Sequence, residues 1–142
     1  SEIIALGGGQ SEAKGVDAKD PVAAAEAVGI ALAREFGSVV VITSNVDFVT
    51  DGNQSARVGG GSPMMPLITA MGCSLTCLTG AFAAVAAPMD AAVSALTMFA
   101  EAGDRAARTA SGPASFSQHF IDQLHATTPE PFAASSWVTW DT

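Results

Sequence analysis

The stretch "SVVVIT" at residues 38–43 decides the fold class of this chain. It is a continuous run rich in β-branched residues, and Gly37 separates it from a helical pattern upstream. Such runs are typical of strands that are buried on both faces of a parallel sheet. The sequence therefore predicts an α/β fold. Because the rest of the chain supplies too few parallel neighbours for this strand, we expect the missing strands to lie before Ser1 or in another chain.

A helix is predicted directly before this strand. Asp20 and Pro21 are a typical N-cap residue and first helical residue, and Gly37 is a typical terminator. The apolar residues between them recur in steps of three and four, as on one face of a helix. These residues are Val22, Ala25, Val28, Leu32 and Phe36. At the start of the chain, Ser1 and Glu2 precede apolar residues and predict a further short helix.

Downstream of the strand, the sequence predicts a hairpin and three helices. Residues 51–53 (Asp-Gly-Asn) are a turn signal between two β-rich runs. Residues 72–87 are apolar nearly all round, so we expect this helix to be deeply buried. Pro88 ends it, a second helix follows, and a third runs from about Ser115 to Ala126. The inward residues expected in the last two helices are Met89, Val93, Leu96, Ala100, Phe116, Phe120, Ile121 and Leu124.

The composition narrows the possible functions. The chain has 142 residues, of which 49% are hydrophobic and 14% are charged, so it can bury a core as one domain. Its net charge of −8 disfavours nucleic acid and anionic membrane surfaces as partners, because both attract basic proteins. The longest apolar stretch, residues 72–87, is too short to span a bilayer. Cys73 and Cys77 fit neither a disulfide framework nor a zinc site, which suits a reducing cytoplasm.

The opening residues point to a longer protein. The chain begins without methionine, and "SEIIAL" runs directly into an apolar segment. We therefore expect an N-terminal half to accompany it, since half of an α/β sheet would expose an apolar strand edge and favour aggregation.

The first candidate for chemistry is the junction at residues 69–73, where a loop meets the start of a predicted helix. Backbone N–H groups at a helix N-terminus carry partial positive charge and bind anions. Gly72 lets a ligand approach the backbone closely, and Cys73 is the adjacent thiol. The alternative is that Cys73 is a small buried residue of a core helix.

Two further candidates are Thr43 and Glu2. Thr43 ends the predicted strand, and open parallel sheets bind ligands at the carboxyl ends of their strands. Its hydroxyl could contact a phosphate, or it could bond only its own loop. Glu2 could hold Mg²⁺ through water, or it could be no more than a favourable charge at a helix start. Asp47 and Asp51 flank the predicted hairpin, where turn chemistry accounts for them.

Taken together, these stretches resemble one family, the hydroxyethylthiazole kinases of the ribokinase-like superfamily. The resemblance reaches from Ser1 to about Pro129, and this chain looks like the C-terminal half of the family protein. It is carried by five motifs, the last four of which follow the order and approximate spacing of the family. The motifs are "SEIIAL", "KGVDA", "VVVITSNVDFVTDG", "MGCSLT" and "GPASF".

The resemblance implies a fold and an activity. It implies a three-layer sandwich with a mainly parallel central sheet, of which residues 1–129 form the C-terminal part. The Pro- and Ser-containing sequence at the end of the chain separately predicts an irregular tail over residues 130–142. It implies transfer of the γ-phosphate of ATP to the hydroxyl of 4-methyl-5-(2-hydroxyethyl)thiazole, in thiamine biosynthesis and salvage. It also implies a cytoplasmic, Mg²⁺-dependent homotrimer whose active sites lie between subunits.

The resemblance also implies roles for single residues. Glu2 matches the acid of the family's magnesium motif, and Thr43 matches a threonine that contacts nucleotide. Met71 and Gly72 fall on the nucleotide side of the family's G-T-G-C loop, and Ala70 and Cys73 on the substrate side. Gly72 and Cys73 end that loop and are the expected catalytic pair, with the thiol standing where related sugar kinases carry an aspartate base.

The chain departs from the family pattern at these same motifs. Ala70 and Met71 replace Gly and Thr of the G-T-G-C loop, and Ser44-Asn45 replaces a common Gly-Glu. Two alternatives to the kinase therefore stay open. One is a diverged member that binds nucleotide or thiazole without catalysis, and the other is a kinase for a related small hydroxyalkyl heterocycle.

Overall fold

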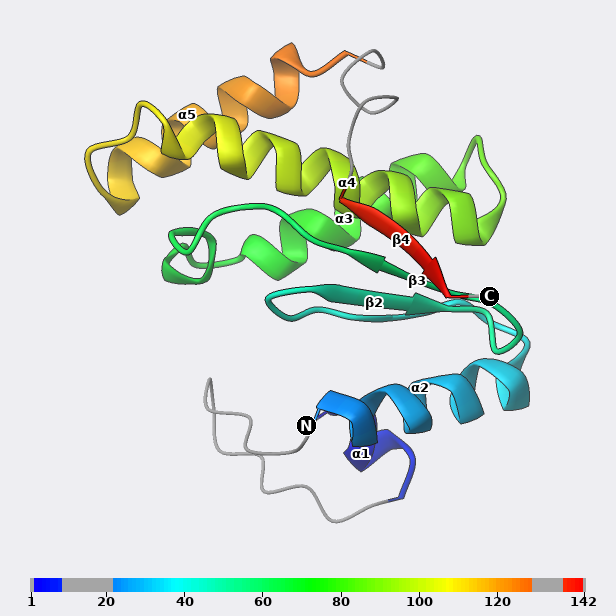
Figure 1. Cartoon of the computed structure of the whole chain (residues 1–142). Coiled ribbons are helices and arrows are strands. Elements are labelled where there is room, and N and C mark those ends of the chain that lie inside the picture. Colours follow the sequence, from blue (N-terminus) through cyan, green and yellow to red (C-terminus); the bar gives the residue numbers. More distant parts are fainter. Residues whose placement is uncertain (1, 9–21, 129–136, 142) are drawn as a thin grey trace.

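Helices lie on both faces of an antiparallel sheet in the computed structural model of this chain (Figure 1). The structure describes residues 2–8, 22–128 and 137–141. Two helices cover one face and three lie over the other, which confirms the predicted α/β class. The first face carries α1 (Glu2–Leu6) and α2 (Val22–Phe36), and the second carries α3 (Met71–Ala83), α4 (Pro88–Ala107) and α5 (Pro113–Ala126).

The sheet has four strands in the order β1-β2-β3-β4, and every neighbouring pair is antiparallel. The strands are β1 (Val40–Ile42), β2 (Asp47–Thr50), β3 (Ser55–Val58) and β4 (Val138–Asp141). β1 was expected to be buried on both faces among parallel neighbours, yet all three of its residues are half-buried. Within the described residues β1 pairs only with β2, so one backbone edge of β1 has no strand beside it. This edge is the reason for the incomplete burial.

α2 packs closely on β1 through a glycine. A Cβ atom placed on Gly29 would lie 3.0 Å from Cδ1 of Ile42 and 3.5 Å from Cγ1 of Val40. The helix therefore accepts a residue of poor helix propensity because a side chain there would hold the helix away from the strand. α2 ends where predicted, at Gly37, which has φ of 58°. The N–H of Ser38 donates to the carbonyl of Ala33 at 3.1 Å, which closes the end of the helix.

The predicted hairpin is confirmed as β2 and β3. Oδ1 of Asp51 accepts the N–H groups of Asn53 at 2.8 Å and Gln54 at 2.9 Å. Gly52 occupies the positive-φ position of the turn, with φ of 89°. The turn chemistry expected of Asp51 is therefore what the structure shows.

The core consists of two clusters joined along α4. One cluster lies between the sheet and α4 and contains Val49, Ala56, Val58, Met89, Ala92, Val93 and Leu96. The other lies between α4 and α5, where the ring of Phe120 meets the ring of Phe99 edge to face at 4.8 Å. The second cluster contains Phe99, Ala102, Ala106, Phe116 and Phe120. The predicted inward faces of α4 and α5 are thus largely confirmed.

Three expectations about burial were wrong. No residue of α3 is buried, because this helix packs on α4 and the core with Leu75 and Leu78 while its other side faces outward. Phe36 is 68% exposed at the last residue of α2, and Ile121 is 64% exposed on α5. Both sit on helix surfaces that no other described element of the chain covers. No helix in the described residues is long and apolar enough to cross a bilayer.

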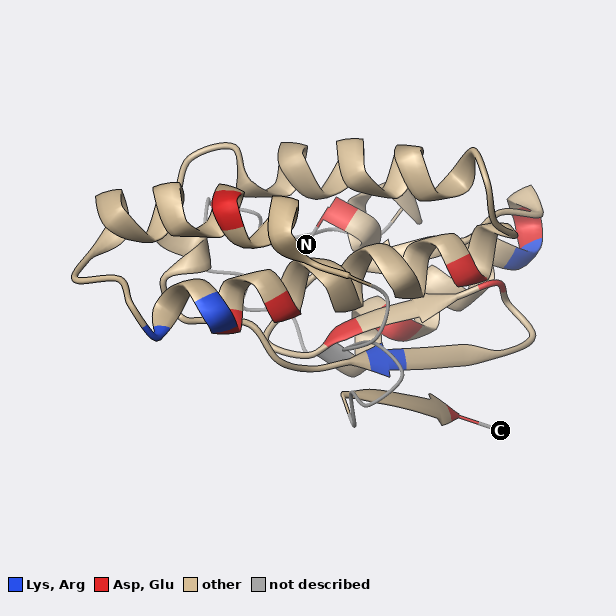
Figure 2. Ribbon diagram, turned by 90° about the horizontal axis from the view of Figure 1, so that it is seen from above, with Lys and Arg blue, Asp and Glu red and all other residues tan. Residues whose placement is uncertain are grey.

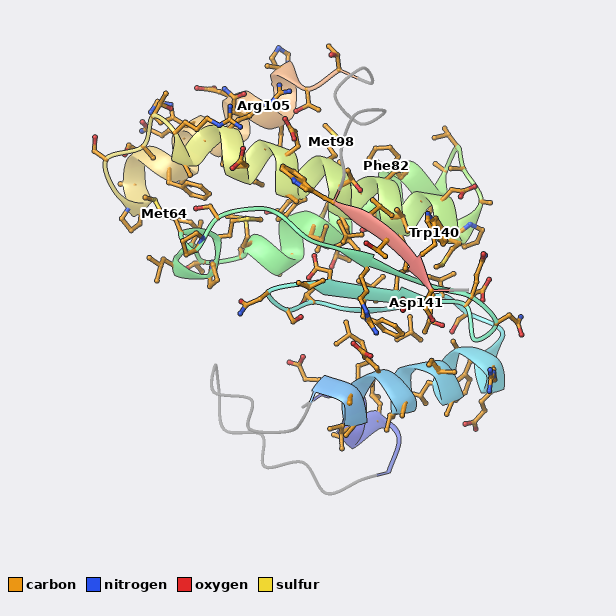
Figure 3. All side chains as sticks on the ribbon, viewed as in Figure 1. Met64, Phe82, Met98, Arg105, Trp140 and Asp141 are labelled. Atoms are coloured by element: carbon orange, nitrogen blue, oxygen red, sulfur yellow. The ribbon has the colours of Figure 1, made fainter. Side chains whose placement is uncertain are left out.

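The C-terminal tail, expected to be irregular over residues 130–142, contains β4. The N–H of Gly59 donates to the carbonyl of Trp137 at 2.9 Å, and β4 then pairs with β3 from Val138 onward. Trp140 and Asp141 project from this strand (Figure 3), and the Asp141 carboxylate lies 3.4 Å from the Arg57 guanidinium. The predicted helix start at Asp20–Pro21 lies outside the described residues.

Candidate active site

The N-terminus of α3 is formed without a side-chain cap. Ala70 is the N-cap residue, and no side-chain hydrogen bond caps the helix there. The carbonyl of Ala70 accepts the N–H of Ser74 at 3.0 Å and the Ser74 hydroxyl at 3.1 Å. No side chain of the described residues caps the first turn of this 13-residue helix, at the end where the peptide dipoles favour an anion.

Ala70 has a strained backbone. Its φ of 65° and ψ of 16° lie in the left-handed region, and it is the only non-glycine residue with positive φ in the described residues. An L-residue in this region costs roughly 1–2 kcal/mol. The position is therefore one where glycine would be the ordinary choice.

The predicted catalytic pair is open to solvent. Gly72 and Cys73 are both exposed, and a Cβ atom placed on Gly72 would meet nothing within 4 Å. Met71, directly before them, is half-buried and packs against the cluster between α4 and α5. Among the described residues, Cys73 is therefore not buried as the packing alternative expected. Cys77, one turn further along α3, is also exposed.

Thr43 lies at the end of β1, exposed, at the first position of a tight turn that leads into β2. Asp47 begins β2 and is paired with Val58, the last residue of β3. The segment from Val58 leads to a short 3₁₀ helix, Met65–Leu67, and then to α3. The Thr43 turn and the beginning of α3 thus lie at the same end of the sheet (Figure 1).

Glu2 belongs to a different layer. It is exposed in the first turn of α1, and α1 packs against α2 on the face of the sheet opposite α3 (Figure 1). In the described ranges no group of three or more His, Cys, Asp or Glu residues is placed to hold a metal. The described part of the chain therefore offers Glu2 as a single acidic group and does not gather it with Cys73 and Thr43.

The arginines of the described ranges all have acceptors, and α3 itself carries no charged residue. Figure 2 shows the charged residues on elements other than α3, whose sequence contains none. The pairs are Arg34 with the Gly52 carbonyl, Arg57 with Glu26, Arg105 with Glu101 and Arg108 with Asp104.

Asp47 is a further candidate residue at this end of the sheet, and the sequence did not single it out. Its half-buried position raises the pKa of its carboxyl to about 6, although the hydrogen bond from the Ser44 N–H acts in the opposite direction. Asp47 had been assigned to turn chemistry alone. The alternation of side chains along the strand could have identified it, because Asp47 lies on the same face as Val49, which is fully buried.

These features define a class, namely an α/β protein with a helix N-terminus that lacks a side-chain cap, an exposed thiol in the first turn of that helix, and an exposed threonine at the same end of the sheet. The particular family follows from comparison with known proteins. The chain belongs to the hydroxyethylthiazole kinase family, whose model matches residues 1–130. The resemblance predicted from the sequence motifs is therefore confirmed.

Individual relatives agree with the family. The chain is 59% identical over 141 residues to the hydroxyethylthiazole kinase of Gemmatimonas aurantiaca, which covers 99% of this chain and 51% of that protein. It is 56% identical over 128 residues to that of Rhizobium rhizogenes, covering 89% of this chain and 48% of the relative. A solved hydroxyethylthiazole kinase from Pyrococcus horikoshii matches with a TM-score of 0.80 and 32% identity, over 85% of this chain and 48% of that one. The chain thus spans about half the length of the relatives it matches.

Proposed function

We propose that this chain supplies the C-terminal half of a kinase that transfers the γ-phosphate of ATP to the hydroxyl of 4-methyl-5-(2-hydroxyethyl)thiazole, in thiamine biosynthesis and salvage. The observation that carries the proposal is the start of α3, where an uncapped helix N-terminus lies beside an exposed Cys73. Phosphoryl transfer depends mainly on positioning and on stabilisation of charge. Backbone N–H groups at a helix N-terminus supply both functions without a charged side chain.

The proposed chemistry assigns a role to each residue of this loop. The N–H groups of Met71, Gly72 and Cys73 bind oxygens of the transferring phosphoryl group. A bond forms between the substrate oxygen and the γ-phosphorus, the bond from that phosphorus to the β–γ bridging oxygen breaks, and ADP leaves. The thiolate form of Cys73 accepts the proton of the substrate hydroxyl, a transfer that typically contributes about 10²–10⁴-fold. Ala70 contacts the thiazole side, and Thr43 contacts the nucleotide.

Mg²⁺ enters the proposal through Glu2. A single exposed carboxylate fits this ion, because Mg²⁺ usually takes one or two carboxylates and completes its shell with phosphate oxygens and water. Since Glu2 is not part of a group of three or more possible metal ligands in the described residues, the remaining ligands would come from ATP, water and other parts of the protein. When bound, the ion neutralises charge on the phosphates.

The proposed assembly completes the sheet and the site. An N-terminal half would add parallel strands to the open edge of β1 and give the mainly parallel, three-layer sandwich that the family resemblance implies. A cytoplasmic homotrimer with active sites between subunits follows from the same resemblance. Its support here is a set of large apolar side chains that lie exposed, including Leu6 at 74%, Leu67 at 65% and Val85 at 84%.

The test is a product assay on an assembled kinase. We define the fusion kinase as this chain joined to the part of the Gemmatimonas aurantiaca relative that it does not match. Incubation with ATP, Mg²⁺ and the thiazole should give ADP and thiazole phosphate in equal amounts, detected by ³¹P NMR. ADP without thiazole phosphate would reject the proposal. Light scattering on the same sample should give the mass of three subunits.

A second candidate function is binding without catalysis, and the strained backbone of Ala70 favours it. Strain and a bulky neighbour at the anion loop could allow nucleotide to bind while preventing transfer. Calorimetric titration of the fusion kinase with ATP and with thiazole separates the two functions, because heat of binding without product would support this candidate. If thiazole is not bound, a series of related hydroxyalkyl heterocycles should be titrated next.

A further inference from the structure

Asp47 closes the turn that follows Thr43. Oδ1 of Asp47 accepts the N–H of Ser44 at 2.8 Å. The Ser44 hydroxyl donates to the carbonyl of Val46 at 2.6 Å, and the N–H of Val46 lies 3.3 Å from the same hydroxyl oxygen. The residue directly after Thr43 is therefore fixed at its N–H by a carboxylate and at its hydroxyl by the backbone.

The strand register places Asp47 opposite Thr43. β1 and β2 pair Val40 with Thr50, Val41 with Val49 and Ile42 with Phe48. Continuing this antiparallel ladder by one rung sets Thr43 across from Asp47. Because side chains alternate along a strand, both positions fall on the face of Val49, which packs against α4. This is also the side of the sheet on which α3 lies (Figure 1).

Placing a charged carboxylate at position 47 costs free energy, because the side chain is partly removed from water. Asp47 is half-buried at the start of a strand, and no arginine of the described residues pairs with it. Turn formation alone could be served by a smaller polar residue, as the Ser44 hydroxyl already does for Val46. The acceptor oxygen at residue 47 therefore has a task beyond closing the turn, and that task offsets the cost of burying a carboxyl group there.

We propose that Asp47 is a positioning residue for ATP, which holds the turn after Thr43 so that the threonine hydroxyl faces the nucleotide. This inference rests on the proposed function, in which Thr43 contacts nucleotide. A short rigid turn matters because the hydroxyl can bind a phosphate or ribose oxygen only within a narrow range of positions. The acceptor oxygen at residue 47 is the required feature, and the negative charge is not.

The test measures ATP affinity and turnover in the fusion kinase. Asp47→Ala removes the acceptor and should weaken ATP binding about tenfold. This is the change in affinity that corresponds to the net contribution of one hydrogen bond. The KM for thiazole should stay within about twofold of the parent. Asp47→Asn keeps an acceptor oxygen and should restore ATP affinity to within about threefold. Asp47→Val, which favours a strand and lacks the acceptor, should repeat the Ala result if the Ala variant fails to fold.

Asp51→Ala is the matched control. Asp51 also caps a turn of the same sheet with a carboxylate, but that turn lies at the other end of β2. Its loss should lower stability and leave ATP affinity unchanged. Equal ATP affinities for the Asp47→Ala and Asp51→Ala variants would overturn the inference. An Asp47→Asn variant that binds ATP as weakly as Asp47→Ala would also overturn it.

The Thr43→Ala variant distinguishes a failure of this inference from a failure of the proposed function on which it rests. If Thr43→Ala weakens ATP binding and Asp47→Ala and Asp47→Val do not, the positioning role is wrong while the proposed function stands. If the parent fusion kinase binds no ATP, both are wrong. Calorimetric titration with a non-hydrolysable ATP analogue gives the affinity even where turnover is too slow to measure.

Discussion

Arg57 of β3 and Glu26 of α2 form a two-point ion pair, with Nη1–Oε1 at 3.1 Å and Nη2–Oε2 at 3.0 Å. The guanidinium also lies 5.1 Å from the centre of the Phe48 ring and 3.4 Å from the Asp141 carboxylate. One side chain therefore connects α2, β2, β3 and β4. Its cross-strand neighbour Phe48 directly follows Asp47, so Arg57 lies one residue from the rung that adjoins the Thr43 turn.

Arg57→Lys should lower the free energy of unfolding of the fusion kinase by about 1 kcal/mol, because lysine keeps the charge and loses the two-point geometry. The pair is partly exposed, which limits the loss. Urea unfolding measures it. Arg108→Lys is the control, since Arg108 is 71% exposed in a pair with Asp104, and its effect should be below about 0.5 kcal/mol.

Ala70→Gly should raise the free energy of unfolding by about 0.5–1 kcal/mol. Glycine removes the roughly 1–2 kcal/mol cost of the left-handed backbone, and part of this gain is lost to the greater freedom of the unfolded chain. Ala81→Gly, inside α3 and exposed, should instead lower stability by about 0.5–1 kcal/mol. A destabilised Ala70→Gly variant would mean that the methyl group has a packing role.

Asp47→Asn should change how stability depends on pH. The folded state raises the Asp47 pKa from 3.8 to about 6, so its favourable contribution is full below pH 3.8 and is lost as pH rises through 6. The Asn variant should therefore gain stability relative to the parent from pH 4 to pH 7, by about 1–2 kcal/mol once partial exposure is allowed for.

Asp51→Asn should show the opposite slope in the same experiment. Hydrogen bonds from the Gln54 and Asn53 N–H groups lower the Asp51 pKa, so its contribution is present above the unfolded value and lost as pH falls. Relative to the parent, this variant should be least stable at neutral pH and should recover toward acid. Parallel slopes for the two variants would contradict the assignment for Asp47.

Gly29→Val should destabilise the protein by about 1–3 kcal/mol, because the added atoms would enter the contact between α2 and β1. Ala27→Val introduces the same residue at an exposed position of the same helix and should cost well under 1 kcal/mol. If both variants unfold at the same urea concentration, the close approach at Gly29 is not a constraint.

Local patterns in the sequence were enough to predict the helices and the hairpin. Pro88 and the Asp51 turn carry their own backbone preferences, so α4 and the β2–β3 hairpin were predictable. β4 was not, because its pairing with β3 is a contact between residues far apart in sequence with no turn between them. The exposure of α3 was not predicted. A helix that is apolar on all sides is expected to be buried, but the pattern does not say whether the same chain or another chain buries it.

The site was predictable in part for the same reasons. The loop-to-helix pattern located Gly72 and Cys73, and the end of the β-branched run located Thr43. The left-handed backbone of Ala70 is invisible to residue preferences, since alanine does not favour it. Asp47 was passed over because two aspartates beside a hairpin have the same local explanation, and only the register separates them.

The most direct test of the central claim, that the start of α3 handles the phosphoryl group and substrate, compares two thiols on one helix. Steady-state rates and ATP affinities should be measured for Cys73→Ser and Cys77→Ser in the fusion kinase. The account predicts that Cys73→Ser lowers kcat by about 10²-fold or more with ATP affinity within about twofold, while Cys77→Ser leaves both unchanged. Equal kcat values for the parent and the Cys73→Ser variant would contradict it.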